Sequence, residues 1–287
     1  MKFDKESNVL IIGLGVIGGS YAKALTEKGY KVDCITLERE SIDYAKERGM
    51  IRYGTTEVEE ELVKNADLVI FAIYPGAFVE WIKKYGHLFK KGSWITDVTG
   101  VKGSVVYKIE ELMPEGVEFI SAHPMAGREQ SGVEFSDPSV FKGANYIVTP
   151  TEKSTPEAIA LCKRLGEELG FARISELSPK EHDVMIGFLS QLTHCIAVTL
   201  MNCSTADGLE KYTGDSFRDL TRIAKINDKM WSELFISNKD ALIYQMDTFI
   251  KEFSDFRWLI ANENREEMRE KMRASTERRK LFDKPKA

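Results

Sequence analysis

Cysteine is scarce in this chain and follows no recognisable pairing pattern. Only four cysteines occur among the 287 residues, and they are scattered through apolar segments. Their spacing fits neither a disulfide framework nor a metal site, so no metal is expected. We therefore expect buried, reduced thiols, which are typical of a cytoplasmic protein. The four residues are Cys34, Cys162, Cys195 and Cys203.

An excess of positive charge and long apolar runs are also missing. The formal net charge is −5 with both signs mixed, which gives no electrostatic footprint for nucleic acid. No apolar run is expected to approach the length of a membrane span, and the start MKFDK does not resemble a signal peptide. The length leaves room for two domains with sizeable cores. These features favour a cytoplasmic enzyme with a small-molecule substrate, and with neither a nucleic acid nor a membrane as partner.

A glycine-rich segment follows the first apolar strand. Residues 8–12 (NVLII) predict a buried strand, and residues 13–20 (GLGVIGGS) lead into helical spacing. This is the Gly-x-Gly-x-x-Gly pattern between a strand and a helix, which predicts dinucleotide binding rather than a merely structural turn. The glycines allow a tight turn, close approach of a pyrophosphate and close helix packing, and the helix N-terminus favours the phosphate charge. The predicted cofactor contacts here are Gly13, Gly15, Val16, Ile17 and Gly18.

The end of the second predicted strand bears on the choice of cofactor. An acidic residue there would bind both ribose hydroxyls of NAD. Thr36 occupies this place, with Glu38 and Arg39 just beyond it. Threonine does not repel a 2′-phosphate, and Arg39 could pair with one. NAD(P)+ is thus the expected cofactor, with NADP favoured over NAD, although Glu38 could still bind a ribose.

Strands and helices alternate up to about residue 177. Residues 67–72, 94–96 and 145–149 predict further strands, and a proline-started helix with Thr155 as N-cap ends near Gly170. Such alternation predicts an α/β fold, with a doubly wound parallel sheet and right-handed crossovers of the Rossmann type over residues 1–177. Further cofactor contacts are expected where strands end, at Tyr74, Pro75 and Asp97.

One histidine stands at the end of another predicted strand. Residues 117–121 are apolar and β-branched, and His123 follows them. We expect it just past the carboxyl end of a parallel strand, where open α/β sheets bind ligands. Pro124 holds the backbone of His123 extended, and Gly127 permits a turn close to a ligand. The alternative is an ordinary histidine in a loop.

From Ser178 the pattern becomes purely helical. Ser178 and Glu181 form a predicted capping box with a proline at the first helical position. Ser190 and His194 stand one turn apart on this helix, with Gln191 beside them. An all-helical domain over residues 178–287 is expected to bind substrate and form a dimer. Its later apolar stripe predicts packing within the domain or between subunits, through Leu242, Met246, Phe249, Phe253, Phe256 and Ile260.

Four motifs together resemble one enzyme family. They occur in order between about residue 8 and about residue 270, which makes them far more specific than the glycine loop alone. On these residues the chain resembles the prephenate dehydrogenases, which convert prephenate to 4-hydroxyphenylpyruvate on the path to tyrosine. Some members of the family use arogenate instead, or both. The motifs are GLGVIGGS at 13–20, DVTGVKG at 97–103, HPMAG at 123–127 and FRDLTRIA at 217–224.

The resemblance implies roles for particular residues. Hydride leaves C4 of prephenate as the ring carboxylate departs as carbon dioxide, and the C4 hydroxyl must lose its proton. His123 matches the family's catalytic histidine, and a neutral imidazole suits this proton transfer near pH 7. Arg222 matches an arginine that grips a substrate carboxylate, which a guanidinium can do bidentately. Further positions that match the substrate pocket are Ser190, Gln191, His194 and Glu129. The family also implies a homodimer formed through the helical domain.

Two positions depart from the family pattern. Gly100 stands where the family commonly has a serine that touches the substrate hydroxyl. The neighbouring Thr99 could supply that hydroxyl from a different backbone position, so it is a second catalytic candidate. Gln191 replaces a histidine on the pocket helix, which removes one possible cation and keeps arogenate open as the substrate.

Some of these residues have simpler possible roles, and two other functions share features of this sequence. We expect His182 to make a structural hydrogen bond, and Lys102 could be an ordinary lysine at a helix start. A β-hydroxyacid-type dehydrogenase shares the glycine loop and the helical second domain, but that class needs a catalytic lysine where this chain has Gln191 and His194. A dinucleotide sensor without catalysis is the other alternative, and Gly100 motivates it.

Overall fold

The computed structural model describes residues 3–127 and 130–283. Clustering of contacts divides the chain into two compact units, Met1–Lys239 and Asp240–Ala287. The first unit holds all the strands among the described residues and the candidate site residues that lie among them. The second unit holds most of one long helix and the helix after it.

The large sheet has six strands with a parallel pairing at every step. Their order is β3-β2-β1-β4-β5-β6, so the chain moves outward from β1 in one direction and then from β4 in the other. The crevice between β1 and β4 is therefore the switch point at which such sheets bind ligands. The strands are β1 (Asn8–Ile12), β2 (Lys31–Ile35), β3 (Tyr53–Thr55), β4 (Leu68–Phe71), β5 (Trp94–Asp97) and β6 (Glu118–Phe119).

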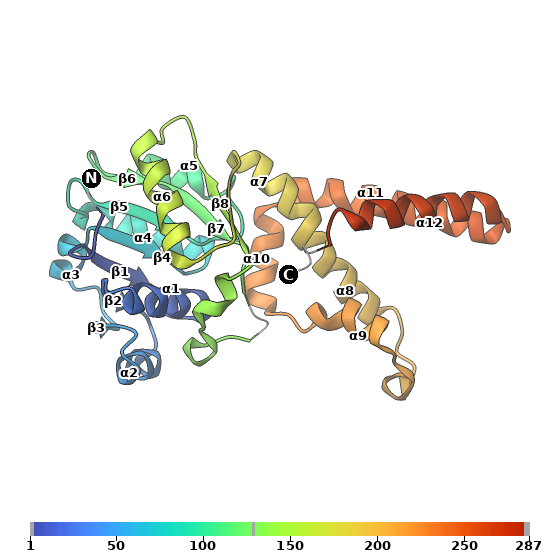
Figure 1. Cartoon of the computed structure of the whole chain (residues 1–287), viewed down its shortest axis with the longest axis horizontal. Coiled ribbons are helices and arrows are strands. Elements are labelled where there is room, and N and C mark those ends of the chain that lie inside the picture. Colours follow the sequence, from blue (N-terminus) through green and yellow to red (C-terminus); the bar gives the residue numbers. More distant parts are fainter. Residues whose placement is uncertain (1–2, 128–129, 284–287) are drawn as a thin grey trace. The chain divides into compact units, whose positions relative to one another are not determined.

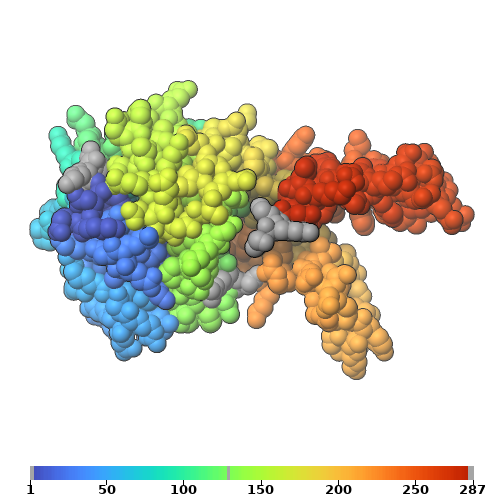
Figure 2. Space-filling model, viewed as in Figure 1, coloured from blue at the N-terminus to red at the C-terminus, as the bar shows by residue number. Residues whose placement is uncertain are grey.

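Helices cover both faces of this sheet, and alternate strand residues supply two cores. In β1, Val9 and Ile11 belong to one buried cluster, whereas Leu10 and Ile12 belong to the other. α1 and α6 pack together on the first face, and α4 and α5 pack together within the second cluster (Figure 1). Figure 2 shows the yellow-green surface of α6 beside the blue surface of α1. The helices are α1 (Val16–Glu27), α2 (Arg39–Glu47), α3 (Glu60–Asn65), α4 (Pro75–Tyr85), α5 (Val106–Leu112) and α6 (Pro156–Leu169).

The predicted helix boundaries of α6 are confirmed. The Thr155 side chain accepts a hydrogen bond from the backbone N–H of Ala158, and Pro156 is the first helical residue. Gly170 ends the helix at φ 86°, a left-handed conformation that glycine adopts without steric cost. Local capping chemistry was therefore sufficient to place both ends of this helix.

The histidine strand differs from the prediction. His123 lies inside β7 (Ser121–Pro124) rather than past the end of a parallel strand, and it stands opposite Ile147 in an antiparallel pair. β7 belongs to a separate sheet with β8 (Asn145–Thr149) and β9 (Arg173–Glu176). The predicted doubly wound parallel sheet is therefore confirmed for β1 to β6, but it does not include the histidine strand or the strands after it. Because the residue before a proline favours an extended backbone, Pro124 continues the strand through His123.

Short helical turns interrupt the connections of this unit. Near His87 a single 3-10 turn follows α4, and two more lie between β7 and β8. The two turns between β7 and β8 pack onto α1, and the backbone N–H of Asp137 donates to the Ser20 hydroxyl at 2.9 Å. The turns are η1 (Gly86–Leu88), η2 (Val133–Phe135) and η3 (Pro138–Phe141).

One continuous helix runs from Pro179 to Asn202. It comprises α7 (Pro179–Ile186), a π-helical segment η4 (Gly187–Leu192) and α8 (Thr193–Asn202). The predicted capping box is present, with both hydrogen bonds between Ser178 and Glu181. By length and composition this helix could cross a membrane, because an 18-residue stretch within it has a mean hydropathy of 1.7. The expectation that no apolar run approaches that length was therefore wrong. One such helix is weak evidence of a membrane span, and this one carries buried polar residues bonded to the rest of the unit.

The remaining helices follow in sequence order. In the first unit, η6 and α9 pack against α8. In the second unit, Lys271 and Glu252 form an ion pair of 2.9 Å between α11 and α12. Phe249, Phe253 and Phe256 of the predicted apolar stripe line a groove between these two helices. The elements are η5 (Leu209–Tyr212), α9 (Asp215–Thr221), η6 (Arg222–Ala224), α10 (Asp228–Ser237), α11 (Lys239–Ala261) and α12 (Arg265–Lys280).

Candidate active site

The glycine loop makes a turn that only glycine tolerates at two positions. Gly13 has a φ of 94°, and a Cβ there would lie 2.6 Å from the carbonyl oxygen of Ala72. A Cβ on Gly18 would lie 2.1 Å from the carbonyl oxygen of Gly13. Both glycines thus allow β1, α1 and the end of β4 to approach one another closely.

The start of α1 leaves room for a ligand. Among the described residues, no atom other than those of its own neighbours in the chain lies within 4 Å of where a Cβ of Gly15 would be. Gly15 is the N-cap of α1 and offers no side chain to the first turn, where Val16 and Ile17 begin the helix. Free backbone N–H groups and the helix dipole favour an anion at such a place. These residues fit the pyrophosphate of a nicotinamide dinucleotide.

The residues after β2 lie beside this loop. Thr36 is buried, and its hydroxyl accepts a 3.4 Å hydrogen bond from the backbone N–H of Leu14. Glu38 and Arg39 are exposed at the start of α2. The Thr36 side chain therefore holds the end of β2 against the glycine loop, whereas the side chains of Glu38 and Arg39 are exposed to solvent. Their part in cofactor choice stays a prediction.

The loop after β4 begins α4 and contacts the segment around α10. Tyr74 is the N-cap of α4 and Pro75 is its first residue. The Tyr74 hydroxyl accepts from the Asn227 amide at 3.2 Å, and the N–H of Gly76 donates to the Glu233 carboxylate at 2.5 Å. Because β1 and β4 are parallel neighbours, Tyr74 and Pro75 lie at the same sheet edge as the glycine loop. Contact with the cofactor there stays a prediction.

A buried ion pair lies behind the end of β5. The side chains of Asp97 and Lys102 are both fully buried, and their Oδ2 and Nζ atoms are 2.9 Å apart. Lys102 also donates to the carbonyl oxygen of Ala122 at 2.7 Å, and the Ser121 hydroxyl donates to Asp97. Burial lowers the pKa of Lys102, and the Asp97 carboxylate opposes that shift. The pair therefore joins the loop after β5 to the strand that carries the histidine.

Two predicted site residues belong to this buried cluster. The Thr99 hydroxyl lies within hydrogen-bond reach of Asp97 and 3.0 Å from the carbonyl oxygen of Val101. Asp97 also accepts from the backbone N–H of Thr99 at 2.9 Å. Catalysis by Thr99 and a cofactor contact by Asp97 stay predictions, because the polar atoms of both side chains already have partners inside the chain.

His123 presents one ring nitrogen to its neighbours and the other to Gly100. Its Nδ1 lies 2.8 Å from Nε2 of His182. Its Nε2 lies 3.7 Å from the place that a Cβ of Gly100 would take, and Leu234 lies equally close to that place. Burial, followed by the electrostatic influence of the neighbouring His182 and Lys102, lowers the pKa of His123 well below its ordinary value. The imidazole is therefore neutral at neutral pH and able to accept a proton.

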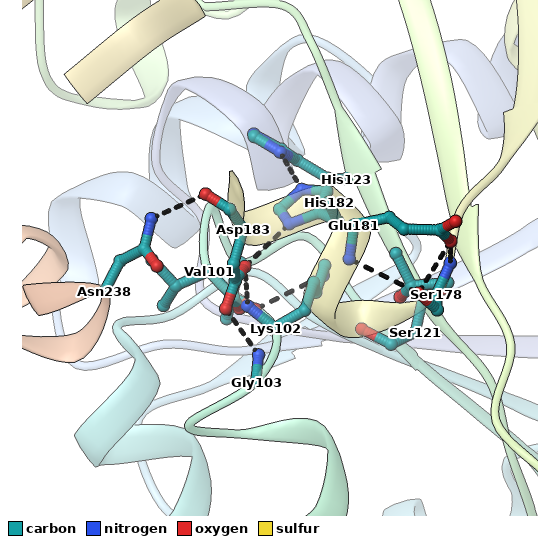
Figure 3. Close-up of polar contacts among 12 residues, drawn as sticks. Val101, Lys102, Gly103, Ser121, His123, Ser178, Glu181, His182, Asp183 and Asn238 are labelled. Carbon is teal, nitrogen blue, oxygen red and sulfur yellow. Dashed lines mark hydrogen bonds and ion pairs between the residues drawn. The ribbon is translucent and has the colours of Figure 1, made fainter. Parts of the chain in front are cut away.

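His182 and Asp183 continue the contacts of His123 (Figure 3). Nδ1 of His182 lies 2.8 Å from Oδ1 of Asp183. The Asp183 carboxylate also accepts from the backbone N–H groups of Lys102 at 2.8 Å and Gly103 at 2.7 Å. Burial lowers the pKa of the fully buried His182. The sequence predicts only a structural hydrogen bond for His182, and no pattern in it marks Asp183.

Gln191 is buried and hydrogen-bonded at both ends of its amide. Its Nε2 donates to the carbonyl oxygen of Leu234 at 3.1 Å, and its Oε1 accepts from Asn238 at 2.7 Å. The Asn238 amide also donates to the carbonyl oxygen of Asp183 at 2.9 Å. These bonds tie α10 to the long helix 179–202. A contact of Gln191 with substrate stays a prediction.

His194 is held by its own helix and by an aromatic ring. Its Nδ1 donates to the carbonyl oxygen of Ser190 at 2.8 Å, which leaves Nε2 as an acceptor in the neutral form. The ring stacks on Trp231 of α10, with ring centroids 3.7 Å apart. Burial lowers the pKa of His194. Trp231 was not singled out in the sequence, because no spacing within α10 indicates what packs against its ring.

The structure gives less information about the two charged residues that are predicted to contact the substrate. Arg222 is exposed in η6, which packs against α8, the helix that carries His194. Glu129 lies outside the described residues. The convergence of Arg222 and Glu129 on His123 therefore stays a prediction.

The fold and site together define a class of enzyme. A doubly wound sheet with an open, glycine-lined helix N-terminus and a neutral histidine beside the end of β5 defines a nicotinamide-dinucleotide-dependent dehydrogenase. Two family models match the chain: the nucleotide-binding domain of prephenate dehydrogenase over residues 21–175, and the prephenate dehydrogenase dimerization domain over residues 178–274. The chain belongs to the prephenate dehydrogenase family.

The similarity to individual relatives extends over most of this chain and over most of each relative. A prephenate dehydrogenase from Lactococcus lactis is 32% identical, with 86% of this chain and 69% of the relative covered. One from Bacillus subtilis is 29% identical, over 92% of this chain and 72% of the relative. The crystal structure of prephenate dehydrogenase from A. aeolicus, in complex with hydroxyphenyl propionate and NAD+, superimposes with a TM-score of 0.89. It is 34% identical and covers 98% of this chain and 100% of that chain.

Proposed function

We propose that this protein oxidises prephenate to 4-hydroxyphenylpyruvate and carbon dioxide with NAD(P)+, in tyrosine biosynthesis. The observation that carries the proposal is that family similarity extends over both halves of the chain, while His123 keeps a neutral imidazole beside Gly100. A nicotinamide dinucleotide whose pyrophosphate is held at the glycine loop would supply the acceptor for the hydride that leaves C4 of the substrate. The protein contributes binding, orientation and removal of one proton.

His123 is the residue that takes this proton. The C4 hydroxyl of prephenate must lose its proton as the C4–O bond gains carbonyl character. Nε2 of His123 lies on the side of the ring that faces Gly100, away from His182. Because its pKa is lowered, the imidazole is ready to accept a proton throughout the neutral range.

The helical elements supply the rest of the substrate site. We assign the grip on a substrate carboxylate to Arg222, whose guanidinium can bind it bidentately. His194, fixed by Ser190 and Trp231, presents Nε2 as a further polar contact. Ser190, Gln191 and Glu129 complete the proposed set. Thr99, which lies against the Asp97–Lys102 pair, acts in this proposal by supporting the loop that carries Gly100.

A panel of substrates tests this function directly. Purified protein is mixed with NAD+ or NADP+ and then with prephenate, arogenate or a set of β-hydroxyacids, while the absorbance of the reduced cofactor is followed. Turnover with prephenate supports the proposal. Turnover with arogenate alone would reassign the substrate, turnover with a β-hydroxyacid would reassign the reaction, and silence with tight cofactor binding would indicate a sensor.

Replacement of Gly100 by serine should increase turnover. A Cβ at this position meets its nearest atoms at 3.7 Å, which is ordinary contact, so the serine is accommodated without strain. Its hydroxyl would lie beside Nε2 of His123, where it could add a hydrogen bond to the substrate hydroxyl. One added hydrogen bond contributes ~0.5–1.5 kcal/mol, so kcat/KM should rise by roughly two- to tenfold.

The matched control is Gly100→Ala, which adds the same Cβ without a hydroxyl. We expect kcat/KM for prephenate to rise in Gly100→Ser and to stay near the wild-type value in Gly100→Ala. Equal effects of the two variants would mean that the substrate hydroxyl is not held at this position.

The cofactor preference is proposed to be NADP. Thr36 presents no carboxylate to repel a 2′-phosphate, and Arg39 stands exposed at the start of α2, where it can pair with one. Thr36→Asp should shift the preference towards NAD, because a carboxylate at the end of β2 binds the ribose diol and repels the phosphate. The change should appear mainly in the cofactor KM, measured as kcat/KM for both cofactors at one salt concentration.

A second pair of variants separates a specific contribution of Arg39 to NADP binding from a general effect of positive charge near α2. Arg39→Ala should weaken NADP binding more than NAD binding. Arg48→Ala removes the same charge just past the other end of α2, where Arg48 pairs with Glu47, and should change neither. A wild-type enzyme that strongly prefers NAD would contradict this reading of Thr36 and Arg39, and would assign the ribose to Glu38.

Assembly, domain limits and location complete the proposal. We propose a Rossmann domain over residues 1–177 and a helical domain over 178–287 that forms a homodimer. The description of the second matching family model as a dimerization domain supports this, as do exposed apolar side chains such as Phe188 and Leu189 on the helix 179–202. We place the enzyme in the cytoplasm, with which four free thiols agree. Cys34 and Cys162 are buried as expected, whereas Cys195 is only partly buried and Cys203 is exposed.

A further inference from the structure

The strongest unexplained feature near His123 is the chain of contacts through His182 to Asp183. His182 is fully buried, and both of its ring nitrogens are engaged. The proposed proton transfer uses only His123. The hydrogen positions along this chain decide whether Nε2 of His123 is free to act.

The Asp183 carboxylate fixes the first hydrogen. Its Oδ1 accepts from the backbone N–H of Lys102, and its Oδ2 accepts from that of Gly103. Backbone N–H groups can only donate, so both oxygens act as acceptors here. Nδ1 of His182, 2.8 Å from Oδ1, must therefore carry a hydrogen and donate it.

The second hydrogen follows from the neutrality of His182. Complete burial disfavours its charged form and lowers its pKa. A neutral imidazole with a hydrogen on Nδ1 has a lone pair on Nε2. That lone pair lies 2.8 Å from Nδ1 of His123, so Nδ1 of His123 carries the hydrogen and its Nε2 does not.

We propose that His182 and Asp183 are positioning residues that hold His123 as the Nδ1–H tautomer, with the Nε2 lone pair facing the substrate. The inference deepens the proposed function and rests on it. Without this chain, Nδ1 of His123 would have no fixed partner, and a hydrogen on Nε2 would block proton transfer. A carboxylate that orients a catalytic imidazole is a known device, and here a second imidazole lies between the two groups.

The same chain stabilises the product of proton transfer. When His123 takes a proton at Nε2, its ring becomes positively charged, and Nδ1–H still donates to His182. The negative charge of Asp183 stands at the far end of the hydrogen-bonded chain. Lys102, which is paired with Asp97, repels the positive charge on His123. The negative charge of Asp183 offsets part of that repulsion.

Nitrogen NMR of the histidines tests the proposal without any substrate. The chain contains only four histidines, so protein labelled with ¹⁵N at histidine should give four resolvable rings. The His123→Asn and His182→Phe variants assign two of them by the loss of their signals. In the wild type we expect His123 to show a protonated Nδ1 and an unprotonated Nε2 at neutral pH. A protonated Nε2 on His123 would overturn the proposal.

Kinetics of His182→Phe supply the second readout. Phenylalanine keeps a ring of similar size but offers no lone pair to His123. We expect kcat to fall by about 10–100-fold, the range found when the partner that orients a metal-binding histidine is removed, with KM for prephenate and for the cofactor nearly unchanged. The fixed tautomer of His123 should be lost in the NMR spectrum of this variant. Unchanged kcat together with an unchanged tautomer would overturn the proposal.

The controls separate folding, positioning and the proposed function. His87→Asn changes an exposed histidine in η1, and it should leave kcat and the His123 signals unchanged. If His182→Phe fails to fold, the tautomer of the wild type still decides the question. If the wild type shows the expected tautomer but no substrate is turned over, the proposed function fails while the positioning of His123 stands.

Discussion

Replacement of His123 by asparagine should lower kcat by about 10²–10⁴-fold, because loss of a positioned acid–base group typically costs that much. Asparagine cannot accept the hydroxyl proton, but it can fill the space beside His182. The fold and the affinity for cofactor should therefore stay nearly intact, since His123 lies in β7, outside the glycine loop. The measurement is kcat with prephenate, alongside cofactor binding and the thermal unfolding midpoint.

The pH profile gives the same prediction a second test. The lowered pKa of His123 means that the wild-type imidazole stays neutral as the pH falls below about 6.5, the ordinary histidine value. Wild-type kcat should then decline only at distinctly lower pH, where His123 gains a proton and can no longer accept one. The small residual activity of His123→Asn should lack this decline. Turnover of the variant within a few-fold of wild type would remove His123 from the mechanism.

The parts of the fold that could be predicted are those with local causes. The glycine loop, the ends of α6 and the capping box at Ser178 each follow from residues close together in the chain. Steric limits at Gly13 and Gly18 act over a few residues, so the pattern alone identifies the dinucleotide-binding turn. The change near residue 178, from alternating strands and helices to helices alone, could be predicted from the local pattern in the same way.

The pairing of the later strands could not be predicted in this way. β6 and β7 are separated by a single residue, yet they belong to different sheets. β7 pairs with β8, more than twenty residues further on, and the direction of that pairing depends on the connection between them. A run of apolar β-branched residues predicts a strand but does not specify its neighbours.

Only part of the site could be predicted from the sequence, for a related reason. His123 was found because a family motif and a proline mark it. The role of His182 was missed because adjacent helix residues do not ordinarily face each other, so His182 and Asp183 gave no pattern. Their contact depends on the backbone N–H groups of residues 102 and 103, which lie about eighty residues earlier in the chain. Lys102 was interpreted as an ordinary lysine at a helix start for the same reason, although it is fully buried against Asp97.

Replacement of Arg222 by alanine should weaken substrate binding far more than it slows hydride transfer. A hydrogen bond to a charged group is worth ~1.5–3 kcal/mol, which corresponds to a KM increase of about one to two decades. The lower end is expected, because Arg222 is exposed in the protein without substrate and solvent screens its charge. The affinity for NAD(P)+ should not change, since the proposed partner of Arg222 is a carboxylate of the substrate.

The matched control for Arg222 is Arg218, one helical turn earlier in the chain. Arg218 is exposed in α9, and its guanidinium already donates to Asp215 and to the backbone of Thr213. Arg218→Ala removes the same charge from the same region, so a general electrostatic effect on the dianionic substrate would appear in both variants. We expect KM for prephenate to rise strongly in Arg222→Ala and only slightly in Arg218→Ala, with kcat near wild type in both. If KM is unchanged in Arg222→Ala for prephenate and for arogenate, Arg222 supports the structure of η6 and α8, and the carboxylate is held elsewhere.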